Sequence, residues 1–237
     1  MESRRAELSV IKDWVQYWRK YMPRLGARKL YTLIKSKLVE HDIKLGRDGF
    51  FTYLRREGLL VKPKKSYTKT TFSKHWMKKH PNLLKEEGLH DAEHVLVTDA
   101  SSRKIVGHHV SKDMKAESVV KALKMAIKDK RYIGNAVHHS DRGLQYCSAV
   151  YQNALQASQI QPSMTDGYDC YQNALAERVN GILKQEFLLH RCRTFAELKI
   201  LVRESIAIYN DMRPHLSLNM ATPNQVHNRK GQLLELA

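Results

Sequence analysis

The sequence predicts an α/β domain that follows a basic, all-helical N-terminal part. In residues 1–61 apolar side chains recur at the helical period in three stretches. From residue 91 onward, short apolar strands alternate with helical stripes, the order typical of α/β layers. The charge is also divided, because residues 1–80 carry 21 Lys and Arg against 7 Asp and Glu, whereas the remaining 157 residues have a net charge of only +3. A strongly basic part that fits a polyanion therefore precedes a near-neutral compact domain.

Three helices are expected in the basic part. The first ends before Pro23, the second covers about 27–39, and the third covers 47–57. Two short helices joined by a tight turn fit a helix-turn-helix domain over residues 1–61, with the later helix in the major groove. The alternative is a three-helix bundle whose basic residues are only solvated. The candidate DNA contacts are Arg47, Thr52, Arg55 and Arg56.

Lysines dominate the next stretch, which shows almost no apolar period. We expect residues 62–90 to be a basic linker that follows a phosphate backbone, each contact adding a salt-dependent increment of binding. A disordered spacer is the alternative. Residues 91–237 then form the compact core, with its elements expected near 95–97 (strand), 104–110 (strand), 119–127 (helix), 136–139 (strand), 148–157 (helix), 160–162 (strand), 173–187 (helix) and 195–209 (helix).

Two acids stand out in the core, Asp141 at the tip of a strand and Glu177 on a helix. Paired carboxylates of this kind suit Mg²⁺, which prefers oxygen ligands and keeps several waters. Two such ions about 3.5–4 Å apart can stabilise the attacking and leaving oxygens of a phosphodiester displacement. The alternative is that Asp141 caps a turn and Glu177 is a solvated helix residue. The helix face of Glu177 also carries Asn173, Asn180 and Lys184.

The words H-S-D-R-G-x-Q-Y and N-A-x-x-E-R-x-x-x-x-L-K-x-E, which contain these acids, resemble the core of insertion-sequence transposases with a retroviral-integrase-like catalytic domain. Between Asp141 and Glu177 lie 35 residues, as in that family's D-(35)-E pattern, and the tail Y-N-x-x-R-P-H is also similar. The resemblance spans roughly residues 24–226. It implies a ribonuclease H-like mixed sheet flanked by helices, and DNA cleavage and strand transfer with Mg²⁺ or Mn²⁺ of the two-metal type. Asp141 and Glu177 would be catalytic metal ligands, Lys184 would contact DNA phosphate, and Asn173 would orient Glu177 or the substrate.

The chain departs from the family at the first catalytic aspartate. The family carries this residue in a word like W-x-x-D-I-T-Y, which is absent, whereas residues 98–107 match the word that follows it. About twenty residues are therefore missing by this comparison. Either residues 95–99 remain the second strand and the sheet loses its central member, or they move into the vacant place beside the strand of Asp141. We expect the second, because an unpaired buried strand edge is costly, and Asp99 could then stand in for the lost acid.

The sequence thus predicts a transposase acting on double-stranded DNA, at element ends and at a target. Its expected partners also include further copies of itself on DNA, and the product of an upstream reading frame, fused or associated. A catalytically impaired remnant that only binds element-end DNA is the alternative. A ribonuclease H-like nuclease unrelated to transposition fits less well, because of the basic N-terminus and the Y-N-x-x-R-P-H tail. Three cysteines without ligand spacing and the lack of a long apolar run lead us to expect a cytoplasmic protein.

Overall fold

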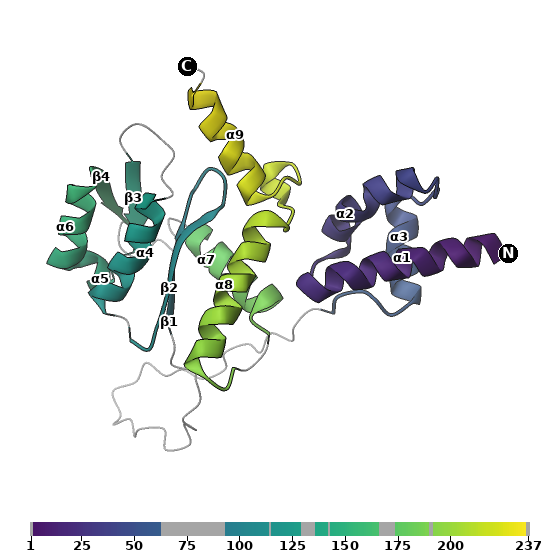
Figure 1. Cartoon of the computed structure of the whole chain (residues 1–237), viewed down its shortest axis with the longest axis horizontal. Coiled ribbons are helices and arrows are strands. Elements are labelled where there is room, and N and C mark those ends of the chain that lie inside the picture. Colours follow the sequence, from purple (N-terminus) through teal and green to yellow (C-terminus); the bar gives the residue numbers. More distant parts are fainter. Residues whose placement is uncertain are drawn as a thin grey trace.

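The computed structural model describes residues 2–62, 93–113, 115–128, 136–141, 143–165, 174–189 and 192–235, and Figure 1 shows their arrangement. The expected helices and strands are confirmed, and α5, the 3-10 turn η4 and α9 are additions that the sequence did not predict. None of the described helices is long and apolar enough to cross a membrane. The elements are α1 (Glu2–Tyr21), α2 (Ala27–Glu40), α3 (Arg47–Arg56), β1 (Glu93–Thr98), β2 (Ile105–Ser111), α4 (Ala116–Lys128), β3 (Ala136–Ser140), α5 (Leu144–Cys147), α6 (Ala149–Ala157), β4 (Ile160–Met164), α7 (Ala174–Ile182), the π-helix η3 (Leu183–Phe187), α8 (Phe195–Asp211), η4 (Leu216–Leu218) and α9 (Pro223–Glu235).

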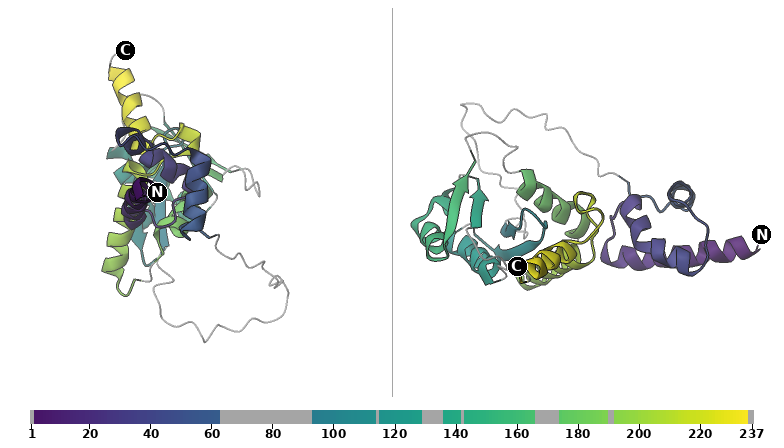
Figure 2. Two further views of the ribbon diagram at one scale, coloured as in Figure 1. Left: turned by 90° about the vertical axis from the view of Figure 1, so that its right-hand side faces the viewer. Right: turned by 90° about the horizontal axis from the view of Figure 1, so that it is seen from above.

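The three N-terminal helices pack against one another at one end of the molecule (Figures 1 and 2). Their apolar stripes meet in a common core that includes Ile11, Leu30 and Leu54, all with no exposed surface. The hydroxyl of Tyr53 on α3 donates to the carbonyl oxygen of Leu8 on α1 at 2.9 Å, which joins the first helix to the third. The helical period in the sequence therefore identified the faces that become buried.

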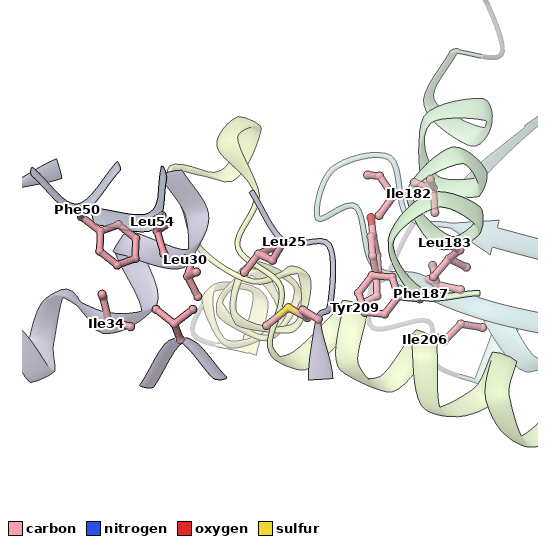
Figure 3. Close-up of a cluster of buried hydrophobic side chains, with 14 of the residues drawn as sticks. Leu25, Leu30, Ile34, Phe50, Leu54, Ile182, Leu183, Phe187, Ile206 and Tyr209 are labelled. Carbon is pink, nitrogen blue, oxygen red and sulfur yellow. The ribbon is translucent and has the colours of Figure 1, made fainter. Parts of the chain in front are cut away.

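The β1–β2 hairpin lies between two hydrophobic cores. Val95 on β1 packs into a cluster with residues of α4, α6 and β4. Ile105 and Val110 on β2 belong to a second cluster, which is formed by α7, η3 and α8 and continues into the N-terminal helices. Figure 3 shows this second cluster, with Leu25 between the residues of the N-terminal helices and those of the core. The hairpin is thus held on both sides by packed helices.

Strand β2 crosses helix α4 in direct contact at Gly107. A Cβ atom at this position would lie 2.1 Å from the carbonyl oxygen of Ala122, and backbone cannot move aside as a flexible side chain can. Close approach of two backbones is one of the uses of glycine in a strand.

The expected position of residues 95–99 beside the strand of Asp141 is wrong. Strand β1 pairs antiparallel with β2 alone, and β3 pairs parallel with β4 alone, so the described strands form two separate two-stranded ladders. The expectation assumed that the β3 edge would be buried. Instead Val137 is 62% exposed and His139 is exposed, so one face of β3 lies open and the strand is not the fully buried one that the expectation assumed. Residues 95–99 therefore do not fill the vacant place beside the strand of Asp141.

Candidate active site

Asp141 follows directly after β3, at the end of a strand whose partner β4 runs parallel to it. Its side chain is exposed, and Oδ1 accepts a hydrogen bond from the backbone N–H of Gly143 at 3.0 Å. The neighbouring Tyr146 is partly buried, and burial, together with the charge of Asp141, raises the pKa of its hydroxyl. Asp141 therefore caps its own turn and still presents its carboxylate to solvent.

Glu177 projects from the first half of α7. Val179 and Ile182 are buried on the opposite face, so the helix is amphipathic and the side chain of Glu177 is exposed. The helix does not continue regularly to Phe187, because the last turn widens into the π-helix η3. Single π-helical turns of this kind are frequent at functional sites. Lys184 lies in this turn and is exposed, whereas Asn173 falls outside the described residues.

Asp99 sits in the tight turn that joins β1 to β2. Its Oδ1 accepts hydrogen bonds from both the backbone N–H and the hydroxyl of Ser102, each at 2.6 Å. The backbone N–H of Arg103 donates to the carbonyl oxygen of Asp99 at 2.8 Å, and Arg103 adopts a positive φ of 64°. One oxygen of this carboxylate is thus occupied in shaping its own turn.

The three acids do not gather into one closed group. Within the part of the chain that the structure describes, no three His, Cys, Asp or Glu side chains lie close enough together to hold a metal ion. Asp141 and Glu177 remain as two exposed carboxylates, which match the oxygen preference of Mg²⁺. A metal at this site would therefore need water or substrate phosphate oxygens to complete its coordination.

A partly buried ion pair, which the sequence did not predict, ties the π-helical end of the Glu177 helix to the C-terminal segment. Arg213 Nε donates to Glu186 Oε2 at 2.8 Å and Nη2 donates to Oε1 at 2.7 Å, with the arginine side chain only 2% exposed. The second amino group, Nη1, lies 3.2 Å from Nε2 of His215. Both ends of this pair belong to motifs of the sequence, since Glu186 ends L-K-x-E and Arg213 begins R-P-H. One sign of this contact was present in the sequence, namely that each of the two residues belongs to a motif.

The four candidate DNA contacts of the N-terminal helices are all exposed on α3. Arg55 lies with its guanidinium 5.0 Å from the ring centroid of Phe51, and Arg56 lies 5.9 Å from that of Tyr53. These aromatic contacts lay two arginine side chains along one helix with their guanidinium groups exposed, and Nε of Arg56 also lies 3.5 Å from Oε1 of Glu57.

Known proteins show which family this chain resembles. Two protein-family models, both described as integrase core domain, match residues 91–170 and 158–223. A 31 kDa protein of insertion element IS600 from Shigella sonnei is 31% identical over 229 residues, which cover 88% of this chain and 83% of that protein. The chain belongs to the insertion-sequence transposases with an integrase core domain.

The transposase InsF for insertion sequence IS3A of Escherichia coli K12 is 30% identical to this transposase over 182 residues, covering 69% of the chain but only 62% of InsF. The crystal structure of the catalytic core domain of BIV integrase superposes with a TM-score of 0.50 at 16% identity, and covers 61% of the chain and 90% of that domain. This likeness confirms the expected fold class, a ribonuclease H-like mixed sheet with flanking helices behind a helix-rich N-terminus.

Proposed function

We propose that this transposase is a polynucleotidyl transferase that cleaves DNA at element ends and joins them to a target. The observation that supports this most is that an exposed carboxylate stands at a strand end, Asp141, and another on a helix face, Glu177, within residues that match integrase core domains. In-line displacement at a phosphodiester requires little covalent chemistry from a protein, so carboxylates that position metal ions suffice.

Mg²⁺ or Mn²⁺, bound as a pair, would activate water and then a DNA 3′-hydroxyl for attack. Asp141 and Glu177 are the proposed ligands. Asp99 would join them as a third, through the oxygen that does not shape its turn, only when DNA and metal draw the three acids closer together than they lie in the described structure. Lys184 would contact a DNA phosphate beside Glu177, because it is exposed in the π-helical turn of the same helix. Asn173 would orient Glu177 or the substrate backbone.

We further propose that residues 1–61 bind DNA as a helix-turn-helix domain, residues 62–90 follow the backbone as a linker, and residues 91–237 form the catalytic core. The concentration of positive charge in the first 80 residues and the exposed arginines of α3 support this division. Double-stranded DNA is the partner, bound by more than one copy of the chain. An upstream-frame product, fused or associated, would complete the assembly.

A strand-transfer assay in Mn²⁺ tests the catalytic part of this proposal. We expect joined product from the wild type and a decrease in rate of about a hundredfold or more in Glu177→Gln, because a displaced catalytic group already costs about that much. Glu204→Gln, an exposed glutamate on α8, is the matched control and should retain the wild-type rate.

Asp99→Asn addresses the third ligand in the same assay. A large decrease in rate supports metal binding by Asp99, whereas an unchanged rate assigns this residue to its turn alone. Equal, null signals from the wild type and Glu177→Gln would instead favour an impaired remnant that only binds element-end DNA.

A further inference from the structure

The C-terminal tail of the core reaches the elements that carry the candidate acids, and it does so through side chains. At the end of α8, the hydroxyl of Tyr209 donates to the carbonyl oxygen of Arg103 at 3.1 Å. The side chain of Asn210 accepts from the backbone N–H of Ile105 and donates to its carbonyl oxygen, both at 3.0 Å. Two adjacent residues of α8 thus hold the hairpin where β2 begins, directly after the turn of Asp99.

Helix α9 contacts the same turn through His227. Nδ1 of His227 lies 3.2 Å from Oγ of Ser102, which itself donates to the carboxylate of Asp99. Ser102 has no exposed surface and His227 only 2%, so this link is buried. The loop of Asp99 is therefore fixed from α8 and from α9.

The third link reaches the helix of Glu177. Glu186 lies nine residues after Glu177, in η3, and receives two parallel hydrogen bonds from Arg213. A bidentate pair sets both distance and orientation, which a single charge contact does not. The pair therefore joins the π-helical end of this helix directly to the C-terminal segment.

We propose that the segment Tyr209–His227, the C-terminal clamp, is a positioning device for the candidate active site. It holds the turn of Asp99 and the helix of Glu177 in one relative position, and the Arg213–Glu186 pair sets the helix. This inference rests on the proposed strand transfer. The two parallel hydrogen bonds fix both the distance and the direction of Glu186 relative to the C-terminal segment, and this geometry is the basis for the positioning role.

A set of three variants separates positioning from stability: Arg213→Met, Glu186→Leu, and the double variant. Glu186→Leu leaves the buried guanidinium of Arg213 without its partner, and Arg213→Met leaves the partly buried carboxylate of Glu186 without its partner. Both changes should lower the melting temperature, Glu186→Leu the more. The double change removes both charges and should restore the melting temperature. If the clamp positions the helix, the strand-transfer kcat of the double variant stays about tenfold to a hundredfold below wild type while KM for DNA is unchanged.

Arg213→Lys adds a conservative variant, which keeps the positive charge but cannot form two parallel bonds. Its melting temperature should stay close to that of wild type, whereas its strand-transfer rate should be reduced. Arg203→Met, which replaces an exposed arginine on α8, is the matched control and should change neither quantity. A double variant that recovers both melting temperature and kcat would show that the pair is only structural and overturn the proposal.

Hydrogen exchange of residues 174–187 provides a readout that does not depend on activity. In the folded double variant these amides should exchange faster than in wild type, with α4 and α6 unchanged, because the helix end is no longer fixed. Exchange identical to wild type would overturn the clamp. If the wild type shows no strand transfer, the proposed function is wrong. The hydrogen-exchange result alone would then show whether the C-terminal clamp positions the helix of Glu177.

Discussion

His215 shows how one side chain depends on its surroundings in the clamp. It is 7% exposed, and its ring meets that of Tyr209 edge-on with centroids 5.0 Å apart. Burial, and then the charge of Arg213, lower the pKa of His215 from 6.5 to about 3. Since an arginine only donates hydrogen bonds, Nε2 must accept from Nη1 of Arg213, which requires the neutral ring.

This pKa predicts acid sensitivity with a definite sign. Between pH 6.5 and about pH 3 the side chain of His215 binds a proton in the unfolded chain but not in the folded chain, so the free energy of unfolding falls as the pH falls. From about pH 7 to about pH 5.5, the free energy of unfolding of wild type should fall by about 1 kcal/mol more than that of His215→Gln. Urea denaturation of both proteins at the two pH values measures this difference. Parallel pH profiles would contradict it.

At the scale of single elements, helix α3 combines a buried face with a basic one. Phe50, Tyr53 and Leu54 are buried, whereas Arg55 and Arg56 are exposed in its last turn. Their contacts with Phe51 and Tyr53 hold both guanidinium groups along the helix. The arrangement leaves one surface of the helix available to a phosphate backbone.

Replacing both arginines should therefore weaken DNA binding and reduce its dependence on salt. For Arg55→Ala with Arg56→Ala, we expect the slope of log K against log salt to fall by about 0.9 for each DNA phosphate that the protein no longer neutralises. Fluorescence anisotropy with a duplex of the element end, at several salt concentrations, measures the slope. Lys20→Ala with Lys35→Ala removes equal charge from exposed positions of α1 and α2 and should leave it nearly unchanged. The same slope in both double variants would exclude α3 as the contact surface.

At the scale of the whole molecule, the N-terminal helices meet the core near the clamp. The buried cluster that contains Leu25 continues into the core as far as Tyr209 (Figure 3). Burial of Lys29 on α2, and then the charge of Arg213 in the clamp, lower the pKa of this lysine from 10.5 to about 8. The charge of Glu186 acts in the opposite direction and raises it. The ion pair that holds the Glu177 helix thus also faces the basic N-terminal part.

This junction predicts a change of stability in alkali. Between about pH 8 and pH 10.5 the unfolded chain keeps a proton on Lys29 that the folded chain has released, so wild type should gain stability relative to Lys29→Met as the pH rises. Urea denaturation at the two ends of this range gives the comparison. Lys35→Met, exposed on the same helix, should show no such gain. A gain that is equal for both variants would argue against burial of Lys29 at this junction.

Periodicity and short sequence motifs predicted most elements and the candidate residues, but not how they pair. Val179, Ile182 and Leu183 recur on one helix face, and all three are buried. The strands were also found, yet residues 95–99 were assigned the wrong neighbour. Strand pairing depends on residues far apart in the chain and on how much water reaches an edge, neither of which a local pattern contains.

The amino-acid order alone determined the family, the basic front part, most of the helices and strands, and the choice of Asp141 and Glu177 as candidate site residues, because these depend on local periodicity, charge and short motifs. Only the tertiary structure decided that the described strands form two separate ladders, that one carboxylate oxygen of Asp99 accepts a hydrogen bond from Ser102, and that Arg213 forms an ion pair with Glu186. Those outcomes depend on burial and on the packing of distant segments. Which groups are removed from water, and which partners then satisfy them, is a property of the folded chain as a whole.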